Sequence, residues 1–271
     1  LNADEQGLGK TLETIAFLKW LKFNMAEVDA EHRGPVLIVA PTSLLENWEA
    51  EVSRHLEEAG LGYLIRLYGS ALAGYKRTGS KGVDTKTGEE LLDFDLLHES
   101  IAEGRGHRFW MLTTYTTLTN YQHSLARIPF SAAVFDEIQA VKNPASLRAH
   151  AGRAISADFR IGLTGTPIEN STTDLWAIMD QLCPGALDTL RDFRSRYGTP
   201  GQGNMDELHA RVFRSQNNLP PLAIRRMKEM VASDLPQKTR RLHPRLMPAE
   251  QATVYEDARL KLAEGSRGGA L

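Results

Sequence analysis

The sequence predicts an α/β protein in which helices cover both faces of a mostly parallel β-sheet. Short apolar runs alternate along the chain with stretches of helical period, which is the pattern of this fold class. The apolar runs contain few polar residues, as strands buried on both faces require. They lie at Val36–Ala40, Tyr63–Tyr68, Phe109–Thr113, Ala132–Asp136 and Arg160–Thr164.

Helices are expected between and after these strands. In the first, the apolar residues share one helical face and form one stripe, made of Leu12, Ile15, Ala16, Trp20 and Phe23. Residues 44–56 and 175–182 show a similar period, and 247–263 reads as one amphipathic helix. Residues 69–88 are rich in Gly, Ser, Thr and Lys, which predicts a long exposed loop.

Composition excludes several classes of protein. The 271 residues are 42% apolar and 24% charged, with a net charge of −2, so the whole chain has no strong electrostatic footprint for nucleic acid. Cys183 is the single cysteine, which excludes an intrachain disulfide and a thiolate zinc site. No apolar run approaches the ~18 residues of a membrane span. We expect an intracellular protein, cytoplasmic or nuclear, with no membrane partner.

The sharpest motif is Gly7-Leu8-Gly9-Lys10-Thr11. A glycine-rich turn that opens a helix directs backbone N–H groups and the helix dipole at phosphates. Lys10 would reach the β- and γ-phosphates of ATP, and the Thr11 hydroxyl would bind Mg²⁺. Many such loops have a first glycine where this chain has Asp4. Only three residues precede Asp4 to form a supporting strand, so we expect the sequence to be a piece of a longer protein.

A second motif, Ala133-Val134-Phe135-Asp136-Glu137, places two acids at the end of an apolar strand. Ligands of open α/β sheets bind at this carboxyl edge. Asp136 would hold Mg²⁺ through water, and Glu137 would polarise the attacking water. A solvated strand end carrying two acids is the alternative, and the presence of the phosphate loop favours the site.

A third motif, Leu163-Thr164-Gly165-Thr166-Pro167, ends another apolar strand with two hydroxyl groups. It could sense the γ-phosphate and pass the change to a nucleic-acid surface. It could equally be a plain turn before a helix that begins near Ser171. Composition does not separate these two interpretations.

These residues resemble the Swi/Snf-type ATPases of helicase superfamily two. That family also has aspartate at the position of Asp4, so the segment from Ala3 to Thr11 is similar to its first motif. Seven further blocks follow in the family's order: Val39–Trp48, Tyr68–Ser70, Thr113–Tyr115, Asp136–Glu137 with Lys142–Asn143, Leu163–Asn170, Ile224–Lys228 and Asp234–Lys238. Tyr68, Ile138 and Met227 depart from common family residues, and none of them removes a group needed for phosphate chemistry.

The resemblance implies a RecA-like P-loop fold and a division of the chain. Residues 1–183 would be the first ATP-binding lobe, 184–243 a helical protrusion, and 244–271 a linker or helix toward a second lobe. It implies ATP and Mg²⁺ as cofactors. The nucleotide would contact Asp4, Gly7, Leu8, Gly9, Lys10 and Thr11; the metal, Thr11 and Asp136; and Lys10, Asp136 and Glu137 would be the catalytic residues.

The resemblance also implies roles beyond the nucleotide. Gln139, Thr164 and Thr166 would couple the nucleotide state to motion. Duplex DNA would contact the lobe through its phosphate backbone at Pro41, Thr42, Ser43, Thr113 and Thr114, because such contacts position a protein without reading sequence. Residues 225–245 contain seven basic and two acidic residues. This local excess of positive charge could belong to a solvated face or to an edge near DNA.

The expected function is therefore that of the first lobe of an ATP-driven translocase on double-stranded DNA. Its partners would be duplex DNA, the second RecA-like lobe of the same polypeptide and possible DNA-bound protein targets. A strand-separating or restriction-type motor of the same superfamily is one alternative. A binding module that does not hydrolyse nucleotide is another, although the intact Lys10, Thr11, Asp136 and Glu137 argue against it.

Overall fold

The computed structural model describes residues 1–27, 29, 32–57, 60–80, 84, 89–215, 218–231, 234, 239 and 241–267. The chain consists of two compact units, Leu1–Ser233 and Asp234–Leu271. The predicted three-part division, with boundaries after residues 183 and 243, is finer than this and stays a prediction.

The larger unit is built on a five-stranded, all-parallel sheet in the order β2-β3-β1-β4-β5. All five predicted strands are present, at β1 (Val36–Ala40), β2 (Tyr63–Leu67), β3 (Phe109–Thr114), β4 (Phe130–Asp136) and β5 (Ala157–Leu163). The registers pair Ala40 with Thr114 and Asp136 with Leu163, so the carboxyl ends of the strands meet at one edge. The predicted α/β fold class is confirmed.

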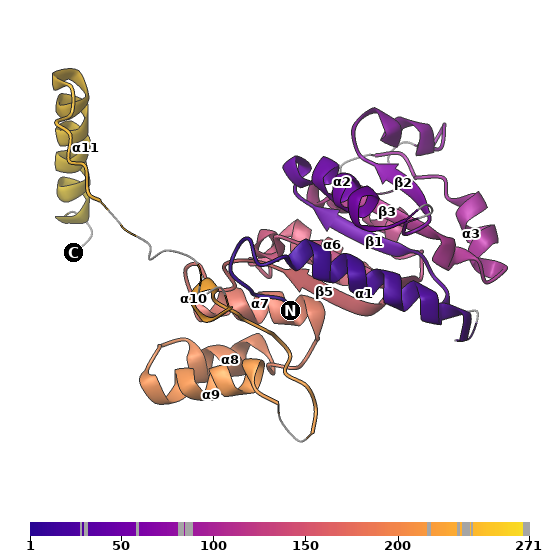
Figure 1. Cartoon of the computed structure of the whole chain (residues 1–271). Helices are drawn as coiled ribbons and strands as arrows, with labels where there is room; N and C mark the ends of the chain where they lie inside the picture. The colour runs from indigo at the N-terminus through magenta and orange to yellow at the C-terminus, as the bar shows by residue number, and fades with distance from the viewer. Residues whose placement is uncertain are drawn as a thin grey trace. The chain divides into compact units, whose positions relative to one another are not determined.

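Helices lie on both faces of this sheet (Figure 1), and apolar side chains form a buried cluster on each face. Helices α1 (Lys10–Asn24) and α2 (Leu45–His55) pack on one face. The other face is covered by α3 (Asp95–Ala102), α4 (Tyr115–Asn120), α5 (Gln122–Ala126), α6 (Leu147–Ala154) and α7 (Thr172–Leu182). The central strand β1 is fully buried, whereas the edge strands β2 and β5 expose alternate or leading residues.

The apolar stripe predicted for the first helix is wrong. Helix α1 buries Thr14, Ile15, Leu18 and Leu21, while Trp20 and Phe23 are 59% and 81% exposed. Leu12 is also exposed, at 42%. The helix carries apolar residues around most of its circumference, so periodicity alone identified a face but not the one that packs. The aliphatic side chains fit the narrow space over β1 and β4.

The residues before the phosphate loop occupy the position of a strand. Asn2 forms parallel bridges to Leu163 at the end of β5 and to Ile224. Its N–H donates to the Gly162 carbonyl at 2.8 Å, and its own carbonyl accepts from the Thr164 N–H at 3.1 Å. On the other side, the Ala3 N–H donates to the Ile224 carbonyl at 2.8 Å. Three residues therefore suffice to hold the loop's amino end against the sheet.

A second, helical layer follows the sheet. Helix α7 buries Ile178 and Leu182 toward the sheet, and Leu175 and Trp176 toward a separate apolar cluster. This cluster is completed by helices α8 (Leu190–Tyr197) and α9 (Gln202–Phe213), which lie together beneath α7 in Figure 1. The chain then returns toward the sheet through Ala223 and ends the unit at α10 (Lys228–Val231).

The loop predicted at 69–88 is more structured than expected over its described part. Residues Gly69–Tyr75 form a 3₁₀ helix, and Lys76 bridges Leu92 in antiparallel fashion. Asp84 is fully buried and accepts hydrogen bonds from the N–H groups of His123 and Ser124. The many small polar residues of this segment gave no sign in the sequence of the 3₁₀ helix or of the buried Asp84. Residues 81–83 and 85–88 lie outside the described residues.

The smaller unit contains one described helix, α11 (Ala249–Arg267), close to the predicted 247–263. Its exposed side chains include Val254, Tyr255, Leu260 and Leu262. Of the predicted block 234–238, residues 235–238 lie outside the described residues. None of the helices described here has the length and apolarity needed to span a bilayer.

Candidate active site

The phosphate loop joins the first short strand segment to helix α1. Gly7 and Gly9 have φ angles of +83° and +82°, a region in which side chains other than glycine are strained. Gly9 is the N-cap of α1, which begins at Lys10. The exposed turn therefore presents the first backbone N–H groups of a 15-residue helix toward solvent.

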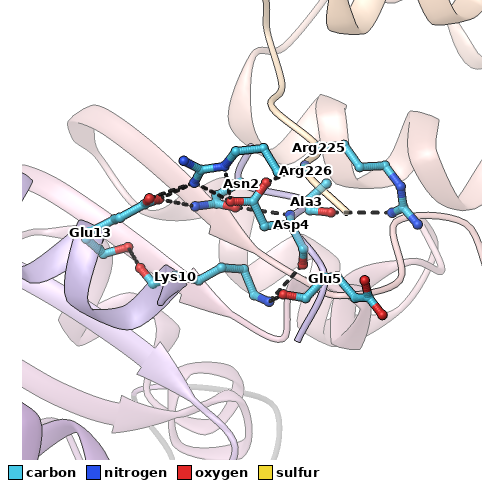
Figure 2. Close-up of polar contacts among 9 residues, drawn as sticks. Asn2, Ala3, Asp4, Glu5, Lys10, Glu13, Arg225 and Arg226 are labelled. Carbon is cyan, nitrogen blue, oxygen red and sulfur yellow. Dashed lines mark hydrogen bonds and ion pairs between the residues drawn. The ribbon is translucent and has the colours of Figure 1, made fainter. Parts of the chain in front are cut away.

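The Lys10 side chain folds back over this loop. Its ammonium donates hydrogen bonds to the Asp4 carbonyl at 2.9 Å and to the Glu5 carbonyl at 3.4 Å. Figure 2 shows the lysine reaching from the start of α1 toward these two residues. The cation is thus held at the mouth of the loop by weak neutral acceptors, which an anionic phosphate could replace.

Asp136 ends β4 and is 7% exposed. Its Oδ2 accepts from the indole N–H of Trp48 at 2.8 Å, and its Oδ1 accepts from the Glu137 N–H at 2.9 Å. Burial raises the pKa of Asp136, and the Trp48 hydrogen bond and the Lys10 charge oppose this increase. Asn2 runs parallel to Leu163, which pairs with Asp136, so the phosphate loop leaves the sheet at the same carboxyl edge as Asp136.

Glu137 has a left-handed backbone, with φ +48° and ψ +53°. A glutamate in this region carries backbone strain, a feature that concentrates at functional sites. The turn directs its carboxylate to Gln139, whose side-chain N–H donates to Glu137 Oε2 at 2.6 Å. Gln139 lies in the 3₁₀ helix Ile138–Val141 that follows.

A chain of hydrogen bonds leads away from Glu137. The Thr164 hydroxyl donates to Gln139 Oε1 at 2.7 Å and accepts from the Thr166 N–H at 3.0 Å. Thr166 in turn donates to Glu169 at 3.5 Å, and Glu169 pairs with Lys142. The three residues predicted to couple nucleotide to motion, Gln139, Thr164 and Thr166, are therefore brought together.

The same turn touches the phosphate loop. A Cβ atom built on Gly165 would lie 3.1 Å from Cγ of Gln6, so glycine allows the close approach. The helix-cap alternative is also present, because Ser171 and Asp174 form a capping box at the start of α7. Capping and contact with the loop occur in different residues of one segment, so both interpretations of this motif describe real contacts.

The Asp4 side chain does not point to the side of the loop that would receive phosphates. Its carboxylate is fully buried and pairs with Arg226, which also pairs with Glu13 in the first turn of α1 (Figure 2). The Arg226 Nε donates to Asp4 Oδ2 at 2.8 Å and the Arg226 N–H to Oδ1 at 2.6 Å. In this structure Asp4 anchors the amino end of the loop to Arg226.

The predicted DNA contacts differ in accessibility. Thr42 and Ser43 are exposed on the 3₁₀ helix Thr42–Leu44, and Pro41 is half-buried before it. Thr114 is 9% exposed and caps α4 by accepting from the Thr117 N–H. Thr113 is fully buried, and its hydroxyl donates to the Leu67 carbonyl at 3.0 Å. A phosphate backbone would not reach the Thr113 side chain in this arrangement, because that side chain is fully buried and its hydroxyl is bonded to the neighbouring strand β2.

Sequence reasoning did not identify three contacts of the site. Trp48 donates to the Asp136 carboxylate, the buried Tyr115 hydroxyl donates to the Asp136 carbonyl at 2.8 Å, and Arg226 pairs with Asp4. Trp48 and Tyr115 lie inside two of the blocks quoted for the family resemblance, which was the available signal. Arg226 lies in a third such block, and only the fold shows its partners.

The donor set fits one Mg²⁺ ion held through few protein ligands. Thr11 offers a hydroxyl and Asp136 a desolvated carboxylate, and Mg²⁺ usually keeps several waters beside such ligands and phosphates. Across the described residues there is no group of three or more His, Cys, Asp and Glu side chains that could form a dedicated metal cage.

Comparison with known proteins gives a family. The profile of the SNF2-related domain matches residues 1–269. The Zorya protein ZorD of Escherichia coli O139:H28 is 37% identical over 243 residues, which is 88% of this chain and 21% of ZorD. The transcription regulatory protein SNF2 of Saccharomyces cerevisiae is 28% identical over 94% of this chain and 14% of its own length. The chain thus spans about a fifth or less of these two relatives.

Solved structures agree with the sequence comparison. The SWI2/SNF2 ATPase core of Sulfolobus solfataricus in complex with dsDNA matches with a TM-score of 0.60 and 28% identity. The match covers 87% of this chain and 42% of that one. A second structure, the SWI2/SNF2 ATPase core domain of Sulfolobus solfataricus, matches with a TM-score of 0.59 and 30% identity. The sheet and its helices are therefore those of a RecA-like lobe.

Proposed function

The chain belongs to the SNF2-related family, and from this premise we propose that it is the first ATPase lobe of a motor that translocates on double-stranded DNA. The observation that carries the proposal is that the phosphate loop, Asp136, Glu137 and the Gln139–Thr164 hydrogen bond lie at one edge of the sheet. Remodelling of DNA-bound protein complexes is the work we propose for the whole motor.

Nucleotide binding begins at the loop. The N–H groups at the start of α1 receive the phosphates, and Lys10 exchanges its two carbonyl acceptors for phosphate oxygens. Thr11 and Asp136 would hold Mg²⁺, which would neutralise charge on the transferred phosphoryl group. Burial raises the pKa of Asp136, and a cation held there would favour the carboxylate form.

Hydrolysis is assigned to Glu137. Its strained turn aims the carboxylate out of the strand, and Gln139 orients it through the 2.6 Å hydrogen bond. The carboxylate would accept a proton from the attacking water or align it for in-line displacement. Because Gln139 also accepts from Thr164, any rearrangement of Glu137 changes the next bond of the chain.

The coupling chain would transmit the nucleotide state to the proposed DNA face. Thr166, Glu169 and Lys142 continue it from Thr164 to the molecular surface. On the neighbouring strand ends, Pro41, Thr42, Ser43 and Thr114 provide the remaining proposed contacts with a DNA backbone. Support for this face comes from a solved relative described as an ATPase core in complex with dsDNA.

A second lobe would complete the machine. We propose that it provides the arginine that stabilises the transferred phosphoryl charge, an effect of roughly 10³–10⁵ in rate. The 271-residue chain alone should therefore bind ATP weakly and hydrolyse it slowly. DNA-stimulated turnover by this chain at the rate of its two-lobe parent would contradict the proposal.

The choice of nucleic acid separates the nearest alternative. The parent protein is titrated with duplex DNA, single-stranded DNA and RNA while ATP hydrolysis is recorded. We expect duplex DNA to stimulate most. A clear preference for single strands or RNA would instead indicate a strand-separating motor, and no hydrolysis with any of them would favour a binding module.

The cellular setting is proposed on the same basis. The relatives include a bacterial Zorya protein and a yeast transcription regulator. We propose that this protein acts inside the cell, on DNA in the cytoplasm or the nucleus, and that its targets are proteins bound to that DNA.

A further inference from the structure

Arg226 joins the two ends of the phosphate loop. Its guanidinium pairs with Asp4, two residues before Gln6, and with Glu13, in the first turn of α1 after the loop. We propose that Arg226 is a positioning residue that holds the loop in its phosphate-receiving shape and couples it to Leu222–Lys228, the return segment. This inference rests on the proposed nucleotide site and adds a residue that acts through the loop.

The geometry of Arg226 suits this role. Its Nε and Nη2 both donate to Asp4 Oδ2, while its backbone N–H donates to Oδ1 at 2.6 Å. Nη2 also donates to both carboxylate oxygens of Glu13, at 2.6 and 2.7 Å. Figure 2 shows the guanidinium between the two acids. A planar, multiply bonded guanidinium fixes direction as well as distance, which an ammonium does not.

The backbone of the return segment is anchored to the same stretch. The Glu5 N–H donates to the Arg226 carbonyl at 3.0 Å, and the Lys228 N–H donates to Glu5 Oε2 at 2.8 Å. The Lys228 ammonium lies beside the loop, because a Cβ built on Gly7 would be 3.5 Å from it. The segment therefore follows the loop from Asp4 to Gly7, with Arg226 as its side-chain link to helix α1.

The loop needs such an external support. Its two left-handed glycines permit the turn but also leave the unliganded chain many alternatives, and ordering them costs binding free energy. The Lys10 contact to the Asp4 carbonyl uses the same residue that Arg226 holds by its side chain. Fixing Asp4 and Glu13 together therefore reduces what the nucleotide must order.

The link works in both directions. If the return segment favours one loop conformation, a nucleotide that binds that conformation must stabilise the return segment by the same coupling free energy.

The test measures binding of MgADP to the 271-residue chain and to four variants. Arg226→Gln and Arg226→Lys remove the multiple bonds; we expect MgADP affinity to fall about tenfold in each. Glu13→Gln removes the exposed half of the link without leaving a buried charge, and about a threefold loss is expected. Arg225→Gln is the control, because Arg225 reaches the Ala3 carbonyl and points away from Glu13 in Figure 2. It should bind like the parent chain.

Amide hydrogen exchange distinguishes positioning from simple stability. In the unsubstituted chain MgADP should slow exchange in both α1 and the return segment; in Arg226→Lys it should slow exchange in α1 only. The inference would be overturned if Glu13→Gln and either Arg226 variant bound MgADP with the affinity of the unsubstituted chain. It would also be overturned if MgADP protected the return segment in Arg226→Lys as it does in the unsubstituted chain. If the unsubstituted chain and its two-lobe parent bind no MgADP, the proposed function itself fails. If Arg226→Gln does not fold, Glu13→Gln and Arg226→Lys decide.

Discussion

The indole N–H of Trp48 donates a 2.8 Å hydrogen bond to Oδ2 of Asp136, although 88 residues separate them in the sequence. Trp48 is fully buried in helix α2, and Asp136 ends strand β4. A donor in this desolvated place favours the ionised carboxylate and opposes the effect of burial on its pKa. The proposed metal ligand thus depends on a residue far from the phosphate loop.

Replacing Trp48 by phenylalanine should raise the pKa of Asp136 further, because the donor is lost and the burial remains. The acidic limb of kcat/KM for ATP hydrolysis by the two-lobe parent should then move to higher pH. Trp110→Phe is the matched control, since Trp110 is also buried but donates to the Gly62 carbonyl. Identical acidic limbs in Trp48→Phe and Trp110→Phe would refute this dependence.

Asp136→Asn should make the stability of the metal-free chain less dependent on pH while abolishing hydrolysis. Burial raises the pKa of Asp136 above its ordinary 3.8, so the folded state binds the proton more tightly than the unfolded state. Stability of the unsubstituted chain therefore falls as pH rises through the interval between these pKa values and stays lower above it. Asparagine does not titrate, so the variant lacks this pH-dependent loss.

Urea unfolding without Mg²⁺ measures this difference. The free energy of unfolding of Asp136→Asn minus that of the unsubstituted chain should become more positive as pH rises through the raised pKa of Asp136. A difference that is independent of pH would show that the carboxylate carries no burial cost.

Thr164→Val should uncouple hydrolysis from DNA. The substitution keeps the side chain's shape and removes the hydroxyl that donates to Gln139 and accepts from Thr166. We expect ATP affinity of the two-lobe parent to stay within about threefold, while stimulation by duplex DNA falls about tenfold or more. Thr164→Ser retains the hydroxyl and should keep most of the stimulation. Equal stimulation in the valine and serine variants would remove the hydroxyl from the coupling path.

Lys22 should make the free energy of unfolding depend on pH above neutrality. Burial lowers the pKa of Lys22 to about 7, from an ordinary 10.5. Between these values the unfolded chain binds more protons than the folded chain, so stability should rise with pH there. Lys22→Met should lose this rise, which is at most about 1.4 kcal/mol per pH unit. Parallel pH profiles of the two proteins would place Lys22 in a more hydrated site.

Much of the sheet could be predicted because parallel strands leave a local signal. Val36–Ala40 is apolar throughout, and its predicted bounds match β1. The first helix shows the limit of this reasoning, since Leu18 and Leu21 pack on the sheet while Trp20 and Phe23 lie in solvent. Apolar residues occupy several faces of that helix, and only the shape of the partner surface selects one.

The candidate site divides in the same way. Lys10, Asp136 and Glu137 lie in short motifs whose chemistry is readable, and the structure joins their charges. The link from Asp4 to Arg226 spans 222 residues, and pairing over such a separation leaves no periodic trace in one sequence. The burial of Thr113 depends on the elements that cover both faces of β3, which a run of apolar and hydroxyl residues does not reveal.

The most direct test of the account is ATP hydrolysis by the two-lobe parent protein carrying Glu137→Gln, measured with and without saturating duplex DNA. Glutamine keeps the shape and the contact with Gln139 but removes the carboxylate's basicity. We predict that DNA-stimulated turnover falls by about 10² or more while ATP binding is retained. Turnover within about twofold of the unsubstituted protein, with the same DNA stimulation, would contradict the assignment of this lobe as the hydrolytic site.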